Sequence, residues 1–138
     1  MIVLDTNVIS EAMRRDSDPA VMAWLDRQQS ESTWTTAISV FELSFGVELL
    51  AGRRRRTLHE ALERILGAGL DGRVLPFDQA AARQSSVIAA RQRRSGRPVE
   101  IRDVEIAGIV AAHGPTLATR NTRDFEAIGL SVVNPWDN

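Results

Sequence analysis

The sequence contains no cysteine, no lysine and no apolar run long enough to span a membrane. Without cysteine, the chain cannot form disulfides, thiolate zinc sites or a catalytic thiol. All 17 basic residues are arginine, so the phosphate-binding lysine of P-loop proteins is excluded as well. A membrane span needs roughly 18 apolar residues, and the start shows no basic leader followed by a long apolar segment. We therefore expect a cytoplasmic protein with no membrane association.

The remaining composition is that of an ordinary globular protein. The 138 residues include 18 acidic side chains, and the formal net charge is −1. This balance gives no overall field that would indicate nucleic acid or membrane, although local patches are still allowed. An apolar fraction of 43% is enough for a core. The length predicts one compact domain over residues 1–138.

Short apolar runs alternate with longer segments of helical periodicity. We predict strands at residues 2–5, 33–36, 73–77, 116–119 and 130–135, and helices at 7–15, 18–29, 38–50, 53–69, 78–96, 103–114 and 124–129. Asp18 and Pro19 are typical of a helix N-cap and first turn. The alternation predicts an α/β fold with a mostly parallel central sheet.

Four carboxylates follow strands of this predicted sheet. They are Asp5, Glu42, Asp103 and Asp124. In a parallel α/β sheet, strand carboxyl ends and helix amino ends share one edge, where such folds place their sites. We therefore expect the four acids to lie at that edge, although they are scattered in the sequence.

Helical spacing places two of these acids on apolar faces. Glu42 shares a face with Ile38, Phe45 and Leu49, and Asp103 shares one with Ile106, Ala107, Val110 and Ala111. A carboxylate on an apolar face is costly unless it is paired or coordinated. We predict that both acids face inward.

Each acid also has a structural alternative. Asp5, Asp103 and Asp124 could each be the N-cap of the helix that follows. Ser39 and Glu42 match a capping box, in which Glu42 would bond back to a backbone N–H. Four independent caps need not point at a common centre, so we favour a shared acidic site.

Four carboxylates at one place repel one another. At an effective dielectric constant of about 20, each like-charge pair at about 4 Å costs on the order of 4 kcal/mol. Protonation or a bound cation relieves this repulsion. An all-oxygen set with no cysteine or histidine favours a hard ion, Mg²⁺ or Mn²⁺, over zinc. The edge is then suited to a phosphate ester.

Four segments in order give the chain a family resemblance. They are "IVLDTNVIS", "TAISVFELSFGV", "RDVEIAGIVAAHGPTLATRNTRDF" and "VVNPW". Together they resemble the PIN-domain ribonucleases, in particular the VapC/FitB-like toxins of bacterial toxin–antitoxin pairs. The resemblance covers essentially the whole chain.

The resemblance implies a fold, an activity and partners. The fold would be a three-layer α/β/α PIN-like domain, usually a homodimer. The activity would be a Mg²⁺-dependent endoribonuclease inhibited by a cognate VapB-like antitoxin, in a complex that binds DNA through the antitoxin. Asp5, Glu42, Asp103 and Asp124 would be the catalytic and metal-binding acids. Thr6, Thr119 and Asn121 would support them.

Arginines near the predicted edge are candidates for binding RNA phosphates. Arg94 and Arg97 precede Asp103, and Arg120 and Arg123 lie in the turn just before Asp124. Arginines at helix ends also complement the helix dipole and stay solvated, and that alternative applies to residues 91–97 and to Arg53–Arg56. Without tyrosine and with few phenylalanines, the sequence gives no sign of base stacking.

Two other functions fit parts of the sequence. One is a different Mg²⁺-dependent phosphoesterase that forms an aspartyl-phosphate on Asp5. That chemistry normally has a second acid two positions later, where this chain has Asn7. The other is a catalytically inactive PIN-like module that binds RNA or protein. A pure binder has no need of four uncompensated acids, so we favour the nuclease.

Overall fold

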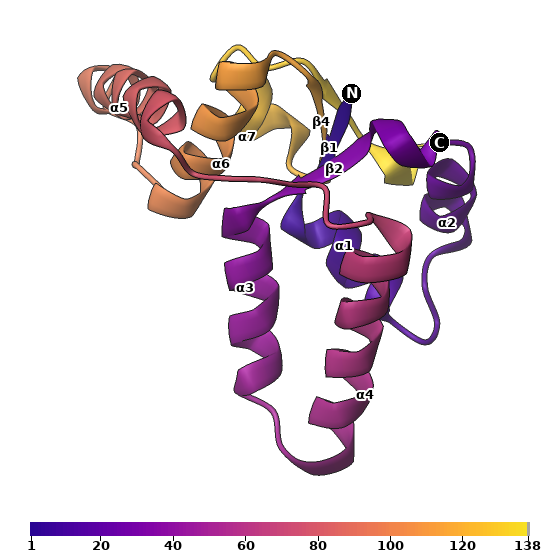
Figure 1. The fold of residues 1–138 in the computed structure, drawn as a ribbon. Helices are drawn as coiled ribbons and strands as arrows, with labels where there is room; N and C mark the ends of the chain where they lie inside the picture. The colour runs from indigo at the N-terminus through magenta and orange to yellow at the C-terminus, as the bar shows by residue number, and fades with distance from the viewer. Residues whose placement is uncertain (138) are drawn as a thin grey trace.

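The computed structural model describes residues 1–137, which form a five-stranded sheet between two layers of helices (Figure 1). The strands are β1 (Ile2–Leu4), β2 (Thr33–Thr36), β3 (Val74–Leu75), β4 (Thr116–Ala118) and β5 (Val132–Val133). All four pairings between them are parallel, in the order β3-β2-β1-β4-β5. The predicted α/β class and three-layer architecture are confirmed. Strand β1 is central, with β2 and β4 on its two sides.

The helices lie where the periodicity predicts them. They are α1 (Thr6–Met13), α2 (Pro19–Asp26), α3 (Ala37–Glu48), α4 (Gly52–Arg64), α5 (Gln79–Arg94), α6 (Ile101–His113) and α7 (Thr122–Glu126). Two 3₁₀ turns, η1 (Ser30–Ser32) and η3 (Pro135–Asp137), and a π-helical turn, η2 (Ile65–Gly69), complete the described residues. In residues 1–137, no helix is both long and apolar enough to cross a membrane.

The boundaries differ from the prediction mainly at the edges of the sheet. Strands β3 and β5 have two residues each, where longer strands are predicted. Each is an edge strand with one neighbour, so fewer of its backbone groups join the ladder. The predicted helix at 53–69 is α-helical only to Arg64 and continues as η2. The predicted N-cap of α2 is confirmed, because Asp18 accepts a hydrogen bond from Ala20 N at 2.9 Å.

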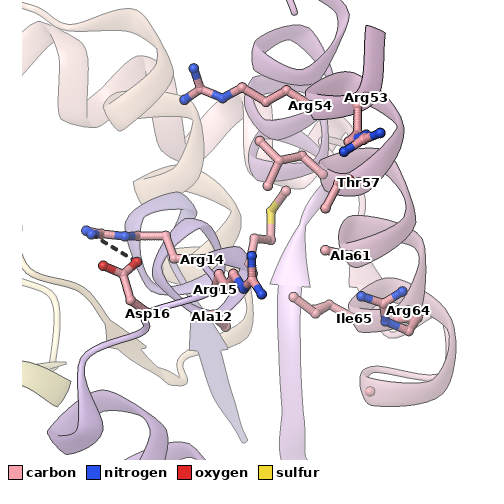
Figure 2. Close-up of a pocket in the computed structure, with 13 residues that line it drawn as sticks. Ala12, Arg14, Arg15, Asp16, Arg53, Arg54, Thr57, Ala61, Arg64 and Ile65 are labelled. Atoms are coloured by element: carbon pink, nitrogen blue, oxygen red, sulfur yellow. Dashed lines mark hydrogen bonds and ion pairs between the residues drawn. The ribbon is translucent and has the colours of Figure 1, made fainter.

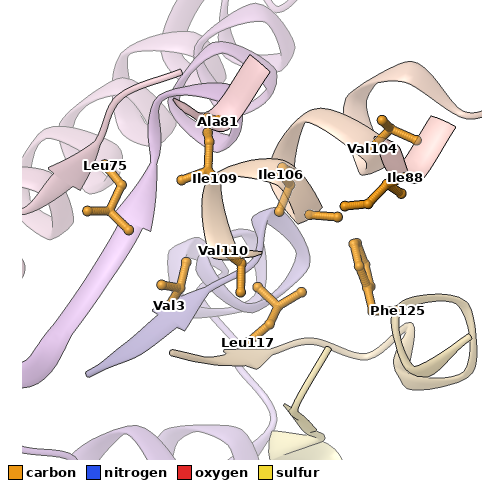
Figure 3. Packing of buried hydrophobic residues seen from close by; sticks show 11 residues of the cluster. Val3, Leu75, Ala81, Ile88, Val104, Ile106, Ile109, Val110, Leu117 and Phe125 are labelled. Carbon is orange, nitrogen blue, oxygen red and sulfur yellow. The ribbon is translucent and has the colours of Figure 1, made fainter. Parts of the chain in front are cut away.

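Successive side chains along the strands belong to two different hydrophobic clusters, one on each face of the sheet. Val3 and Leu117 face α5, α6 and α7, where Phe125 is completely buried (Figure 3). Leu4 and Ala118, the next residues along, belong to the cluster formed with α1, α2, α3 and α4. This alternation is what the pleat of a strand buried on both faces requires. It fixes the direction of the chain as it leaves β1 and β4.

Helices α5 and α6 pack closely at Gly108. A Cβ built on Gly108 would lie 1.8 Å from Ser85 Oγ and 2.6 Å from the carbonyl oxygen of Ala81. The Ser85 hydroxyl also donates to the carbonyl oxygen of Val104 at 3.1 Å. Glycine is therefore required here by the closeness of the two helices. The contact positions α6, which carries Asp103 in its first turn.

We predict that Gly108→Ala destabilises the protein, because the added methyl group must push α5 away from α6. The expected loss is about 1–3 kcal/mol in the free energy of unfolding. Gly46→Ala in α3 is the matched control, since nothing lies within 4 Å of its Cβ position. That control should be neutral or stabilise by up to about 1 kcal/mol. Urea unfolding measures both, and equal effects at the two glycines would contradict the close packing.

Candidate active site

Asp5 is buried where central strand β1 ends, with a relative exposure of 4%. Its Oδ1 accepts a hydrogen bond from Thr6 N at 2.8 Å, and its Oδ2 accepts one from Thr119 Oγ1 at 2.7 Å. Burial raises the pKa of Asp5 above its usual value, these two hydrogen bonds oppose the rise, and the charge of Glu42 adds to it. Asp5 is also the N-cap of α1. It therefore caps this helix, as the structural alternative predicts, and also lies at the predicted edge of the sheet.

Asn7 joins the ends of β1 and β4. Its Nδ2 lies 3.4 Å from Asp5 Oδ2 and 3.4 Å from Thr119 Oγ1. Its Oδ1 accepts from Arg120 N at 3.2 Å. Sequence reasoning missed Asn7 as part of the site. Its position two residues after Asp5, in the first turn of α1, is the signal that could have found it.

Glu42 lies in the second turn of α3 and is held from two sides. Thr6 Oγ1 donates to Glu42 Oε1 at 2.8 Å and also contacts Ser39 Oγ at 2.9 Å. Glu42 Oε2 lies 3.7 Å from Arg102 Nη1 of α6. The capping box of Ser39 and Glu42 does not form. Helix α3 begins one residue before the predicted start, and its N-cap is Thr36, which accepts from Ser39 N at 3.1 Å.

The prediction that the Glu42 face of α3 points inward is wrong in part. The buried residues of this helix are Ser39, Leu43 and Val47, whereas Phe45 is 46% and Leu49 72% exposed. Helices α3 and α4 form a hairpin that projects away from the sheet (Figure 1), so much of α3 has no sheet beneath it. Glu42, 23% exposed at its side chain, lies at the border of the buried side. For α6 the prediction is right, because the residues on the Asp103 face, Ile106, Ala107 and Val110, are buried.

Asp103 and Asp124 are the third residues of α6 and α7. The N-cap alternative is wrong for both. The cap positions are Glu100 and Asn121, and neither makes a side-chain capping bond. The helices start earlier than predicted, which moves both aspartates into the first turn. As a result their carboxylates are not engaged in capping.

The pKa of Asp103 is raised to about 6. Burial is the largest cause, followed by the negative charges of Asp5, Glu100, Glu42 and Asp124. The structure thus brings the four acids near enough for three of them to oppose ionisation of the fourth. Glu100 is an additional acid that the sequence analysis did not assign. Its position three residues before Asp103, one helical turn away, is the signal for it.

A cavity of about 470 Å³ opens beside two of these acids. Asp103 and Asp124 line it together with Arg97 and Arg123. Both arginines are among the residues predicted to bind phosphate, and the structure places them in one cavity wall with two of the acids. Gln92 also lines it, and its buried Oε1 has no hydrogen-bond partner within residues 1–137.

The other predicted residues around the acids lie differently. Arg94, at the end of α5, does not line this cavity. The Arg120 guanidinium lies over the ring of Trp136, 4.9 Å from its centroid. Asn121 contributes its backbone N–H, which donates to Thr119 Oγ1 at 3.0 Å. Thr6 and Thr119 therefore contact the acids through side chains, while Asn121 supports Thr119 through its backbone.

The donor set suits a hard divalent cation in its chemistry. All of its ligands are carboxylate oxygens, and a cation would relieve the repulsion that raises the pKa of Asp103. As the side chains lie, no group of three or more acidic or histidine residues within 1–137 is arranged to hold a metal ion. Two of the acids are instead held by protein groups, Asp5 by Thr119 and Glu42 by Thr6.

A second hollow, which we call the α1–α4 groove, lies between the end of α1 and helix α4 (Figure 2). It has a volume of about 1060 Å³. Its apolar lining includes Ala12, Met13, Leu58, Ala61 and Ile65, and its arginines are Arg14, Arg15, Arg53, Arg54 and Arg64. Arg14 pairs with Glu11 and Asp16. The groove is thus apolar inside and basic at its rim.

We predict that Asp103→Asn stabilises the metal-free protein at neutral pH. Folding raises the pKa of Asp103 from 3.8 to about 6, so wild-type stability falls as pH rises from about 4 through 6. The variant lacks this loss. After allowance for solvent screening, it should be more stable by about 1–2 kcal/mol above pH 7. Urea unfolding in EDTA at several pH values measures this; a difference that persists at about pH 3.5 would contradict it.

Comparison with known proteins identifies the family. Residues 2–130 match the PIN domain. The chain is 46% identical to VapC ribonuclease Y4jK of Sinorhizobium fredii and 41% identical to Toxin FitB of Neisseria gonorrhoeae, with 99% of both chains covered in each comparison. The crystal structure of FitAcB from Neisseria gonorrhoeae superposes with a TM-score of 0.91 at 40% identity, covering 100% of both chains. The chain therefore belongs to the PIN-domain family, among the VapC/FitB toxins.

Proposed function

We propose that this protein is a Mg²⁺-dependent endoribonuclease that acts in the cytoplasm as the toxin of a toxin–antitoxin pair. The observation that carries the proposal is the gathering of Asp5, Glu42, Asp103 and Asp124 at one edge of the sheet, where burial first and then the charges of the neighbouring acids raise the pKa of Asp103 to about 6. RNA as the substrate is supported by the names of relatives. One at 29% identity is a tRNA(fMet)-specific endonuclease VapC of Shigella flexneri.

Asp5 and Asp103 would hold the cation directly, with Glu42 and Asp124 binding through water or a second ion. Mn²⁺ would serve in place of Mg²⁺, because both are hard ions that take oxygen ligands. When bound, the cation supplies Lewis-acid stabilisation of charge on the scissile phosphate. Thr119 and Thr6 keep the carboxylates of Asp5 and Glu42 oriented toward the edge.

The remaining steps belong to residues of the chain. Arg97 and Arg123 line the cavity with Asp103 and Asp124, where their guanidinium groups can bind phosphate oxygens on the RNA backbone. Asp124 orients the attacking water and accepts its proton. The water oxygen bonds to phosphorus as the bond to the 3′-oxygen breaks, and the leaving 3′-oxygen takes up a proton from solvent. Cleavage then leaves a 5′-phosphate and a 3′-hydroxyl.

We predict that the purified protein cleaves RNA with Mg²⁺ and that EDTA abolishes cleavage. Asp5→Asn and Asp103→Asn should each lower the rate about 100-fold or more, because a lost ligand costs several kcal/mol of transition-state stabilisation. Asp71→Asn, before β3 and away from the acidic edge, is the matched control. Gel assays on structured RNA, with circular dichroism to verify folding, test this.

The rival functions give different results in the same assay. An inactive binding module would bind RNA without cleaving it. Another Mg²⁺-dependent phosphoesterase would leave RNA intact and hydrolyse a phosphate monoester. Cleavage that survives in Asp103→Asn would rule out the assigned acids.

An antitoxin partner is supported by the structural neighbours. FitAB bound to an IR36 DNA fragment matches with a TM-score of 0.89 at 39% identity, and DNA-bound VapBC from Salmonella typhimurium matches with 0.79 at 26%. By analogy, this chain would bind a cognate VapB-like antitoxin and, through it, DNA. The family resemblance further implies that the chain is a homodimer and that the antitoxin inhibits it. A short neighbouring reading frame would encode this partner.

The α1–α4 groove suits an antitoxin segment. Its interior is apolar, and four of its arginines, Arg15, Arg53, Arg54 and Arg64, have no ion pair within residues 1–137 (Figure 2). An apolar segment flanked by acidic residues complements such a groove in shape and charge. The groove and the acidic cavity share no lining residue. Binding in the groove would therefore be separable from catalysis.

We predict that Arg53→Glu/Arg54→Glu weakens antitoxin binding about tenfold or more, through repulsion of an acidic segment. Glutamates suit the first turn of α4, so folding should be preserved. Arg56→Glu/Arg83→Glu makes the same change in net charge outside the groove and is the control. Isothermal calorimetry measures the affinity. Equal losses in both double variants would show a nonspecific charge effect, and RNA cleavage by the free toxin should be unchanged.

A further inference from the structure

Arg102 occupies an unusual place beside the acidic edge. It is the second residue of α6 and directly precedes Asp103. Its guanidinium lies 5.2 Å from the ring centroid of Phe41 and 5.9 Å from that of Phe45, both on α3. The two rings are parallel within 7° and 5.9 Å apart. Arg102 thus reaches from α6 to α3, where it contacts both the aromatic pair and Glu42.

The helix itself does not favour an arginine at this position. A positive charge in the first turn opposes the helix dipole. The Phe41–Phe45 pair compensates, because a guanidinium packs flat on aromatic faces. Both rings are about half exposed, so the guanidinium packs against them at the protein surface.

Arg102 and Glu42 form a long ion pair without a hydrogen bond. The distance of 3.7 Å from Nη1 to Oε2 is too long for a hydrogen bond, and the Arg102 side chain is 43% exposed. Glu42 Oε1 is meanwhile held by Thr6 at 2.8 Å. Within residues 1–137, the five N–H donors of Arg102 make no hydrogen bond. The guanidinium is therefore positioned by the rings and has donors left for another acceptor.

We propose that Arg102 balances the charge of Glu42 in the metal-free protein and transfers its donors to an RNA phosphate when a divalent cation takes over Glu42. The inference rests on the proposed function and adds a residue to it. Arg97 and Arg123 line the cavity beside α7, whereas Arg102 lies on the α3 side of Asp103. The backbone of the RNA would then be held on both sides of the acids.

The proposal requires opposite effects on two ligands. Removing Arg102 leaves Glu42 without its counter-charge, so a cation should bind more tightly. The same change removes a phosphate contact, so RNA should bind more weakly. A residue with only a structural role would move neither quantity in this way.

The test compares Arg102→Gln with Arg83→Gln, an exposed arginine of α5 that makes the same change in charge. Mn²⁺ affinity is measured without RNA by electron paramagnetic resonance. It should tighten about three- to tenfold in Arg102→Gln and stay within about twofold of wild type in Arg83→Gln. Unchanged Mn²⁺ affinity in Arg102→Gln would overturn the charge-balancing role.

Cleavage kinetics with Mg²⁺ give the second measurement. Arg102→Gln should raise KM for a single-stranded oligoribonucleotide about five- to tenfold, with kcat within about twofold, and reduce the salt slope of kcat/KM by about 0.7. Phe41→Leu/Phe45→Leu keeps the charge, removes the support and should raise KM in the same direction. Unchanged KM in Arg102→Gln would overturn the RNA contact. Wild-type protein that binds Mn²⁺ but cleaves no RNA would defeat the proposed function instead.

Discussion

The site depends on the burial of one carboxylate, Asp5, at the end of the central strand. Taking a carboxylate out of water costs on the order of several kcal/mol unless hydrogen bonds replace its hydration. Thr6 N supplies one bond from the start of α1, and Thr119 Oγ1 supplies another from the end of β4. Thr119 can reach Asp5 only because β4 pairs directly with β1. The strand order is therefore a condition for the acidic edge, since it delivers the donors that make a buried acid tolerable.

The acids that share this edge are compensated unequally. Asp5 has two strong hydrogen bonds, and Glu42 has Thr6 and the nearby charge of Arg102. Asp103 has no such partner within residues 1–137, and burial, followed by the negative charges around it, raises its pKa to about 6. The repulsion is thus concentrated on one residue in the first turn of α6. In the proposed function, a cation would relieve the most repulsion by binding at Asp103, because Asp5 and Glu42 already accept hydrogen bonds from Thr119 and Thr6. The fold therefore fixes two of the acids by hydrogen bonds and leaves the charge of Asp103 uncompensated.

Those features of the fold that depend on a local sequence pattern could be predicted well. The strand before Asp5, the inward face of α6 and the parallel sheet all follow from periodicity and from the rule that strand ends share an edge. The face of α3 was predicted wrongly, because Phe45 and Leu49 have the spacing of a buried stripe but lie on a hairpin that projects from the sheet. Arg102 was missed for a related reason. Its meeting with Glu42 depends on how α6 packs against α3, and no local pattern encodes that distance.

All basic side chains of this protein are arginines, and this affects how positive charge is placed beside the acidic edge. If the substrate is RNA, as proposed, the acidic centre would repel its phosphates until a cation is bound, and nearby positive charge would hold the RNA. A planar guanidinium can rest on an aromatic ring and still present its N–H groups at its edge, which an ammonium does less well. Arg102 rests on Phe41 and Phe45, and Arg120 rests on Trp136. Within residues 1–137, Arg97 and Arg123 have no such ring contact. Two of these arginines are therefore held by aromatic rings and two are not, and in the proposed function all four would bind the RNA backbone around the acids.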